Sequence, residues 1–455
     1  MKRLIINFGL VPVLLCLLSC ANTEKKEPWI DLAGGSNLEG WTLKNGSAEF
    51  SISNGEITGR AVLNSPNSFL CTDKSFGDFI LEFEVFDQGG FNSGVQIRSI
   101  SDTSVMNGRV HGYQVEIDPS ERAWSGGIYD EARRGWLYPL DLNPEARSAF
   151  RNGEWNSFRV EAIGHHISTW INGVAVANLW DEETSEGFIA LQVHDIGNDS
   201  ALAGTTIHWR NIRIITDNPA NYQTAAAAPE FSRLRNQLTE TEKEKGWQLL
   251  FDGSTTGGWR KAYGETFPEK GWIVEDGILT VLPSDGAEAQ NGGDIVTTGE
   301  YAAFDLHLEF RITKGANSGI KYYVAENEVG NKLSAIGPEF QILDDLNHPD
   351  ALLGNHEGSR TLASLYDLIK AENKKFYGIG VWNSARIVSD GSHVSHYLNG
   401  IKVLEYDRHS DAFRKLVSES KYKDWENFGE APSGHILLQD HGNEVSFRSI
   451  KVLPL

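Results

Sequence analysis

The amino-acid sequence predicts an all-β protein made of two tandem antiparallel β-sandwiches. Short stretches of alternating apolar and polar residues follow one another along the chain, as in strands with one buried face. Turn dipeptides separate these stretches: Asn54-Gly55, Asn172-Gly173, Asp276-Gly277, Asp390-Gly391 and Asn399-Gly400. Long helical periodicity is nearly absent. Many short strands joined by tight turns favour a sandwich architecture.

The N-terminus is predicted to be a lipoprotein signal peptide, residues 1–20. Lys2 and Arg3 precede an apolar run that ends in Leu17-Leu18-Ser19-Cys20, which resembles a bacterial lipobox. In that interpretation Cys20 is acylated and residues 21–27 form a polar tether. The alternative is an ordinary secretory signal with an incidental cysteine. The first interpretation predicts a protein anchored by lipid in the bacterial envelope, periplasmic or surface-exposed, that contacts membrane only through this anchor.

An internal repeat divides the rest of the chain into two copies of one module. Residues 92–98 read NSGVQIR and residues 317–323 read NSGIKYY, 225 positions further on. GEWNSFRVE at Gly153 recurs as GVWNSARIV at Gly380, an offset of 227. Three further pairs keep this order: TWINGVAV with HYLNGIKV, IALQVHD with ILLQDHG, and WRNIRI with FRSIKV. We therefore expect a first domain over residues 28–216 and a second over residues 246–455.

The segment between the copies, residues 217–245, is predicted to be a linker with a short helix. Its first part, DNPANYQTAAAAP, is rich in Ala, Asn and Pro, whereas residues 230–245 carry charges and good helix formers.

Composition limits the kind of ligand. The 455 residues are 40% hydrophobic and 23% charged, as in folded proteins. The net charge of −21 argues against a nucleic-acid partner, since binding phosphates needs a basic face. The balance fits a protein that handles a neutral ligand, and the mixture of many aromatic residues with many glycines is typical of β-rich chains and of surfaces that contact sugars.

The blocks of the second copy carry a resemblance to a known family. These blocks are GWQLLFDG at residues 246–253 followed by Trp259, then NSGIKY, GPEFQILDD, ASLYDL, VWNSARIV, LNG, LLQDHG and FRSIKV. Together they resemble the 3-keto-disaccharide hydrolase family, also described as 3-keto-glucoside 1,2-lyase / 3-keto-2-hydroxyglucal hydratase. The resemblance covers essentially all of residues 246–455. It implies that each copy folds as a concanavalin- or laminin-G-like jelly roll, whose concave face holds the sugar.

The first copy departs from the family pattern. IDLAGGSNLEGW stands where the second copy has its LFDG block, GGIYDEARRGWLY replaces ASLYDL, and LQVHD replaces LQDHG. The order of its two polar strand residues, Gln114 and Glu116, is the reverse of Glu339 and Gln341. We therefore expect the second copy to carry the chemistry. The first copy is active, differently specific, or a binding module.

Alternation within the strands of the second copy predicts its site. If Phe340 and Ile342 fill the core, Glu339 and Gln341 lie on the opposite, wet face. The same pattern places Lys321 and Tyr323 together, opposite Ile320 and Tyr322, and leaves Leu437, Gln439 and His441 facing away from the core. If these faces form one concave surface, amides and charges on it can bind sugar hydroxyls.

The resemblance implies a sugar with a carbonyl at C3, which acidifies the proton on C2. Its elimination chemistry needs a base near C2, an electrophile at the ketone oxygen and an acid at the leaving oxygen. Glu339 or His441 is the candidate base, and Lys321, Tyr366 or Asn383 is the candidate group to stabilise the enediolate. The candidate substrate-binding residues are Gln341, Asn383, Gln439 and Trp259 in the second copy, and Gln114, Glu116, Tyr129 and His194 in the first.

Asp344, Asp345 and His348 raise the question of a divalent cation, because carboxylates beside an imidazole suit Ca²⁺, Mn²⁺ or Zn²⁺. The alternative is a solvated turn, since Asp, Asn, His and Pro are common loop residues.

Two other functions stay open: a non-catalytic carbohydrate-binding lipoprotein on the same scaffold, and a conventional glycosidase with paired carboxylates. Burial of Glu339 beside His441 in one pocket would favour the lyase/hydratase, and a flat aromatic platform would favour the carbohydrate-binding protein.

Overall fold

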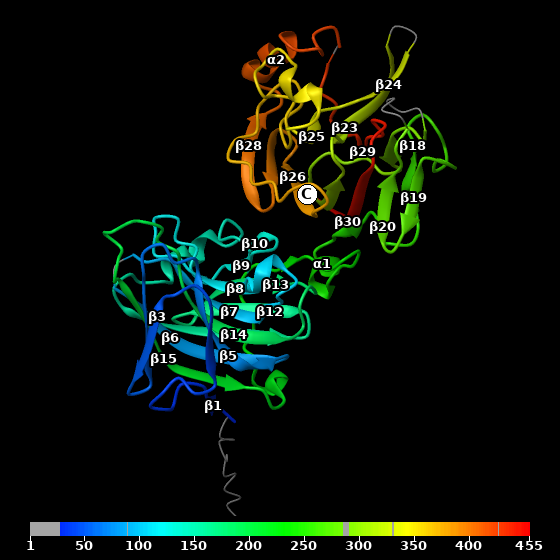
Figure 1. Cartoon of the computed structure of the whole chain (residues 1–455). Coiled ribbons are helices and arrows are strands. Elements are labelled where there is room, and N and C mark those ends of the chain that lie inside the picture. The colour runs from blue at the N-terminus through cyan, green and yellow to red at the C-terminus, as the bar shows by residue number, and fades with distance from the viewer. Residues whose placement is uncertain (1–27, 89, 285–290, 330–331, 426) are drawn as a thin grey trace, which may run out of the picture.

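The computed structural model describes residues 28–455 apart from residues 89, 285–290, 330–331 and 426. The signal peptide and the lipidation of Cys20 lie outside the described residues and stay predictions. Figure 1 shows two β-rich lobes, the N-terminal one in blue to green and the C-terminal one in green to red. Helix α1 (Glu240–Glu244) lies at their junction. In the part of the chain that is described, no helix has the length and apolar character needed to cross a membrane.

The N-terminal domain consists of two antiparallel sheets. The first runs in the order β16 (Phe231–Ser232), β13 (Val174–Trp180), β12 (His166–Ile171), β11 (Trp155–Ile163), β6 (Phe79–Asp87), β15 (Thr206–Ile215), β4 (Glu56–Arg60) and β3 (Glu49–Ser53), with β1 (Ile30–Asp31) also on β15 and β16 added in parallel. The second runs β10 (Gly135–Tyr138), β9 (Ile128–Glu131), β8 (His111–Ile117), β7 (Ser93–Ile100), β14 (Gly187–Val193), β5 (Ser68–Phe76) and β2 (Trp41–Asn45).

The C-terminal domain repeats this plan. Its first sheet runs β19 (Trp272–Glu275), β20 (Ile278–Val281), β30 (Val445–Pro454), β22 (Phe304–Ile312), β26 (Asn383–Ser389), β27 (His393–Leu398) and β28 (Ile401–Asp407), with β17 (Gln248–Leu249) on β30. Its second runs β18 (Trp259–Lys261), β21 (Ile295–Thr297), β29 (His435–Leu438), β23 (Asn317–Val329) and β24 (Lys332–Ile336), with β25 (Glu339–Leu343) also on β23. The remaining helical segments are α2 (Asp411–Ser418), η1 (Met106–Gly108), η2 (Pro144–Ser148), η3 (Pro219–Tyr222) and η4 (Pro349–Leu352).

Each domain has its own hydrophobic core between its two sheets. In both, the inward residues of one sheet pack against those of the other, as the alternating pattern requires. The predicted fold class, two tandem all-β sandwiches, is confirmed. Cys71 is buried and unpaired, like many core cysteines.

The polar faces of β8 and β25 are not wet, contrary to the sequence prediction. Every residue of both strands is buried, and Glu339 and Gln341 keep only 4% and 0% of their surface. Backbone hydrogen bonds explain why β25 is covered. The amide of Ala363 donates to the carbonyl of Gln341 over 2.7 Å, and the amide of Tyr366 donates to the carbonyl of Glu339 over 3.0 Å. A distant loop therefore lies along this strand and hides its polar side chains from solvent.

The predicted shared face of Lys321 and Tyr323 is wrong. The register between β23 and β29 shifts between Lys321 and Val324, and Tyr323 adopts a φ of 51°. This bulge turns both Tyr322 and Tyr323 into the core. The equivalent position in the first copy, Arg98, has a φ of 45°, so both copies contain the same bulge.

Charged groups tie the C-terminal domain to the linker. Arg233 of the linker donates to Glu309 of β22 over 2.7 Å, and Glu309 also accepts from Arg448 of β30. The ammonium of Lys451 on β30 is buried and donates to the carbonyl of Ser232 over 2.7 Å and to Glu242 of α1 over 2.5 Å. Thr239 caps α1 through a capping box with Glu242, which fixes that carboxylate near Lys451.

Candidate functional site

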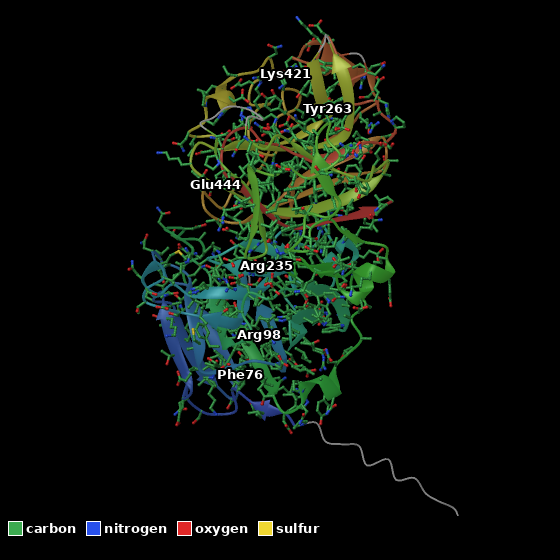
Figure 2. All side chains as sticks on the ribbon, turned by 90° about the vertical axis from the view of Figure 1, so that its right-hand side faces the viewer. Phe76, Arg98, Arg235, Tyr263, Lys421 and Glu444 are labelled. Carbon is green, nitrogen blue, oxygen red and sulfur yellow. The ribbon has the colours of Figure 1, made fainter. Side chains whose placement is uncertain are left out.

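A cavity of about 590 Å³ lies against the second sheet of the C-terminal domain. Among the described residues that line it are three lysines and two carboxylates: Lys261, Lys321, Lys421, Asp294 and Glu339. Figure 2 places Lys421 and Tyr263, another lining residue, toward the end of this domain that lies away from the N-terminal domain. The excess of positive charge suits a ligand that is, or becomes, negatively charged.

Glu339 lies on the floor of this cavity because β25 pairs with β23. The register sets Glu339 directly opposite Lys321 and sets Gln341 opposite Gly319. A Cβ on Gly319 would come within 2.1 Å of Glu339 Oε1, so only glycine leaves room for this carboxylate. The side-chain oxygen and nitrogen of Gln341 both find hydrogen-bond partners when the two atoms exchange places. In that orientation the nitrogen donates to Glu339 Oε1 over 3.1 Å.

Burial decides the ionisation of Glu339. Desolvation raises the pKa of its carboxyl, and the positive charges of Lys321, Lys421 and His441 only partly offset that rise. A carboxylate whose pKa is raised binds a proton more tightly than an ordinary glutamate. Glu339 thus combines a raised pKa with a position in the lining of the cavity.

Lys421 was not predicted from the sequence. Although the residue as a whole is exposed, its ammonium lies 4.1 Å from the ring centre of Tyr366, and desolvation there lowers its pKa. The sequence does contain a signal that could have pointed to Lys421. Matching positions of the two copies lie 227 residues apart at Thr169 and His396, but 247 residues apart at Ile189 and Ile436. The second copy thus has an insertion before Ile436, and helix α2 and Lys421 lie in that part of the chain.

Tyr366 and His441 lie near Glu339 but do not line the cavity. The hydroxyl of Tyr366 donates to Asp350 over 2.8 Å, and its ring supports the ammonium of Lys421. The ring of His441 lies 6.3 Å from that of His348, edge to face. Both residues therefore affect the charge balance at Glu339, Tyr366 through Lys421 and His441 directly.

Gln439 lines the cavity and is incompletely bonded. Its Oε1 atom is buried and has no hydrogen-bond partner among the described residues. Leaving such an acceptor unpaired costs about 1–3 kcal/mol, so a ligand hydroxyl that bonds to it gains affinity. The substrate-binding role suggested by the sequence stays a prediction for Gln439.

The structure places Trp259 and Asn383 elsewhere. Trp259 is a core residue, 4% exposed, whose Nε1 donates to the carbonyl of Leu250 over 2.6 Å. Asn383 is buried, accepts from the backbone amide of Tyr377 and donates to the carbonyl of Val381. Both residues hold the scaffold, and neither lines the cavity.

The three predicted metal ligands are not brought together. Asp344 accepts from the amide of Gly315 and from Asn347, whereas Asp345 accepts from the amide of Leu362 and from Lys374. His348 accepts from the amide of Asp350 at the start of η4. No cluster of three or more His, Cys, Asp or Glu side chains that could hold a metal ion occurs within the described ranges. These residues shape turns, the alternative that the sequence left open.

The predicted residues of the first copy do come together. Gln114, Glu116, Tyr129 and His194 all line a cavity of about 720 Å³ in the N-terminal domain. Burial raises the pKa of the Glu116 carboxyl, as it does for Glu339. The two domains thus place equivalent sheet surfaces under two separate cavities.

The chain matches the 3-keto-alpha-glucoside-1,2-lyase-like domain over residues 28–215 and again over residues 246–453. It belongs to this family, in two copies. The 3-keto-disaccharide hydrolase of Bacteroides thetaiotaomicron is 37% identical over 227 residues, which cover 46% of this chain and 78% of that protein. Both findings make the chain a carbohydrate-active member of a glycoside-acting family.

Two solved structures from Parabacteroides distasonis, each described as a candidate glycosyl hydrolase, are also similar. The first is 30% identical, with a TM-score of 0.43, and the match covers 49% of this chain and 99% of that one. The second is 27% identical, with a TM-score of 0.33, and covers 43% of this chain and 99% of that one. Each match thus extends over about half of the present chain.

Proposed function

We propose that the C-terminal domain cleaves 3-keto glucosides, including 3-keto disaccharides, by elimination across C1 and C2 and then hydrates the unsaturated product. The single observation that carries this proposal is the buried Glu339 carboxylate facing a cavity with Lys321 and Lys421 on its walls. A C3 ketone makes the C2 proton acidic, so one base and nearby positive charge are sufficient to start the reaction. The family match and the Bacteroides relative support the same substrate class.

The residues take separate roles in this scheme. Glu339 accepts the C2 proton, and the electron pair of the C2–H bond moves onto the C3 oxygen as an enediolate. Lys321 and Lys421 place positive charge where that oxyanion forms. The C3 carbonyl then re-forms, the C1–O bond breaks, and the leaving oxygen takes a proton. Lys421 suits this last transfer, because its lowered pKa makes it a better acid than an ordinary lysine.

Hydration completes the scheme. The elimination product has a double bond between C1 and C2. Water adds its oxygen to C1 and gives one proton to Lys421, which lost its own proton in the elimination step. Glu339, whose carboxyl proton exchanges with solvent between the two steps, returns a proton to C2. The net result is hydrolysis of the glycoside, reached without the oxocarbenium-like centre of an ordinary glycosidase.

The Glu339→Gln variant tests the proposal. We expect it to lose turnover of a 3-keto disaccharide, followed by chromatography of the released sugars, because an amide cannot accept the C2 proton. Its thermal stability should not fall below that of the unmodified chain: a buried carboxylate with a raised pKa opposes folding once ionised, and the amide removes that cost. Glu275→Gln, at an exposed end of β19, is the matched control and keeps full turnover. Undiminished turnover by Glu339→Gln would refute the assignment.

A further inference from the structure

The N-terminal cavity lies beside the junction of the two domains and does not belong to the site around Glu339. Its lining includes Gln114 and Glu116 of β8 and Gln192 of β14, the strands equivalent to β25 and β29. One lining residue, Lys375, comes from the C-terminal domain and donates to the hydroxyl of Tyr129 over 3.1 Å. The cavity is therefore complete only when both domains are docked.

Gln192 points to a ligand in this cavity. The residue is 0% exposed and lines the cavity, yet neither its amide nitrogen nor its amide oxygen has a hydrogen-bond partner among the described residues. A buried amide left without partners costs about 1–3 kcal/mol for each unpaired group, which folding alone does not justify. A donor and an acceptor on one rigid side chain match two neighbouring hydroxyls of a sugar ring. Gln192 corresponds to Gln439, which is also incompletely bonded, in the second copy.

The walls of the cavity fit a neutral carbohydrate. Among its described lining residues, the aromatic side chains of Phe69, Tyr129 and Trp136 provide apolar surface for the face of a sugar ring. Arg109, Arg122 and Lys375 balance the carboxylates Glu116, Glu131 and Asp195, so no net charge is left to select an ionic ligand. Arg109 is held by Glu131 over 2.8 Å, and the guanidinium of Arg122 stacks on Trp136.

The groups proposed for elimination at Glu339 are missing from the equivalent places. Gln96 stands in the position of Lys321, opposite Gln114, and the insertion that brings Lys421 has no counterpart in the first copy. Both oxygens of Glu116 are occupied, one by the amide of Asn92 over 2.9 Å and the other by the amide of Gln114 over 2.8 Å. Glu116 is thus a fixed acceptor in a chain of amides rather than a base facing a reactive carbon.

We propose that the N-terminal cavity is a second, non-catalytic carbohydrate-binding site that takes an unoxidised, neutral sugar and is closed by Lys375 of the C-terminal domain. Only the choice of glucose disaccharides as the sugars to test rests on the function proposed above. Such a site would hold the protein on a glycan while the C-terminal domain acts on oxidised sugars.

The experiment measures binding of maltose, cellobiose and trehalose to the full chain by calorimetry and by tryptophan fluorescence, to which Trp136 of the cavity contributes among 13 tryptophans. We expect at least one disaccharide to bind at millimolar concentrations. Gln192→Met should weaken that binding at least about tenfold, the loss expected for one or two hydrogen bonds. The variant should melt no earlier than the unmodified chain, because methionine fills the same volume without unpaired polar atoms. Lys375→Ala should weaken binding less, because its ammonium closes the cavity from the exposed side.

Gln248→Met, at an exposed position of β17, is the matched control and should keep the binding. The proposal is overturned if none of the three sugars binds, if Gln192→Met binds as tightly as the unmodified chain, or if binding is lost in Gln248→Met instead. These readouts involve no turnover. They therefore separate failure of this proposal from failure of the proposed lyase activity, which is measured with oxidised sugar.

Discussion

At the scale of single residues, the same chemical group has different roles according to its surroundings. Glu339 and Glu116 are both buried on equivalent strands and both have raised pKa values. Lysines lie around Glu339 in its cavity, whereas both oxygens of Glu116 are taken by the amides of Asn92 and Gln114, with Arg122 3.7 Å away. Alternation in the sequence predicted which face these carboxylates occupy. Alternation did not predict that these carboxylates are buried. The loop that covers Glu339 comes from a segment distant in sequence, and so does the ammonium of Lys421.

His396 provides a test at the residue scale. Its ring is fully buried in the C-terminal core, accepts from the hydroxyl of Tyr322 and donates to the carbonyl of Ala363. Burial lowers its pKa from 6.5 to about 4, so the folded protein binds this proton less tightly than the unfolded chain does. The free energy of unfolding should therefore be unaffected by His396 above pH 6.5 and fall by about 3 kcal/mol between pH 6.5 and pH 4.

Urea unfolding at a series of pH values measures this effect. His396→Gln should remove that part of the pH dependence, whereas the exposed His409→Gln should leave it unchanged. If both variants lose stability on acidification as the unmodified chain does, His396 is not the group responsible.

At the scale of elements, the site depends on the register between β23 and β25. The period of two in the sequence identified these strands and their core faces, and the repeat identified their counterparts β7 and β8. It could not reveal the bulge at Tyr323 and Arg98, because a single residue with positive φ leaves no mark on the hydrophobic pattern. The bulge moves Tyr323 into the core and leaves Lys321 as the strand residue that faces Glu339.

Gly319→Ala tests this register. The added Cβ would lie 2.1 Å from Glu339 Oε1, so the carboxylate must move by about an ångström. Displacing a catalytic group by that distance costs on the order of 100-fold in rate. We expect turnover of a 3-keto disaccharide to fall by about that factor, with the far-ultraviolet circular dichroism unchanged. Gly94→Ala, the same change in the first copy, should leave turnover intact. Equal rates for the two variants would contradict the placement of Glu339.

At the scale of the whole molecule, the repeat predicted two domains of one fold, and the structure shows them. How the domains dock was not predictable, because Lys375, Arg233, Ser232 and Glu242 lie outside the repeated blocks. Lys375 of the C-terminal domain donates to Tyr129, and Arg233 of the linker donates to Glu309. The ammonium of Lys451 donates to Ser232 and Glu242 of the linker. The linker thus packs against both domains, since β16 pairs with β13 and both Ser232 and Glu242 accept from Lys451.

Fragments of the chain test this conclusion. A fragment of residues 246–455 lacks Ser232 and Glu242 and leaves the buried ammonium of Lys451 without either partner. It should be less stable than residues 230–455 by about 3–5 kcal/mol, the usual cost of breaking a buried ion pair. Lys451→Met should recover much of that loss in the shorter fragment. Equal melting temperatures for the two fragments would show that the linker does not stabilise this domain.

The central claim is that Glu339 removes the C2 proton of an oxidised sugar, and the most direct measurement is deuterium incorporation. A 3-keto disaccharide is incubated in D₂O with the full chain, and the released 3-keto sugar is examined by mass spectrometry and proton NMR, with the free product incubated alone to correct for spontaneous exchange. We predict that C2 of the product acquires deuterium at the rate of turnover and that Glu339→Gln abolishes both. Rapid release of product that keeps its original C2 proton would contradict the account.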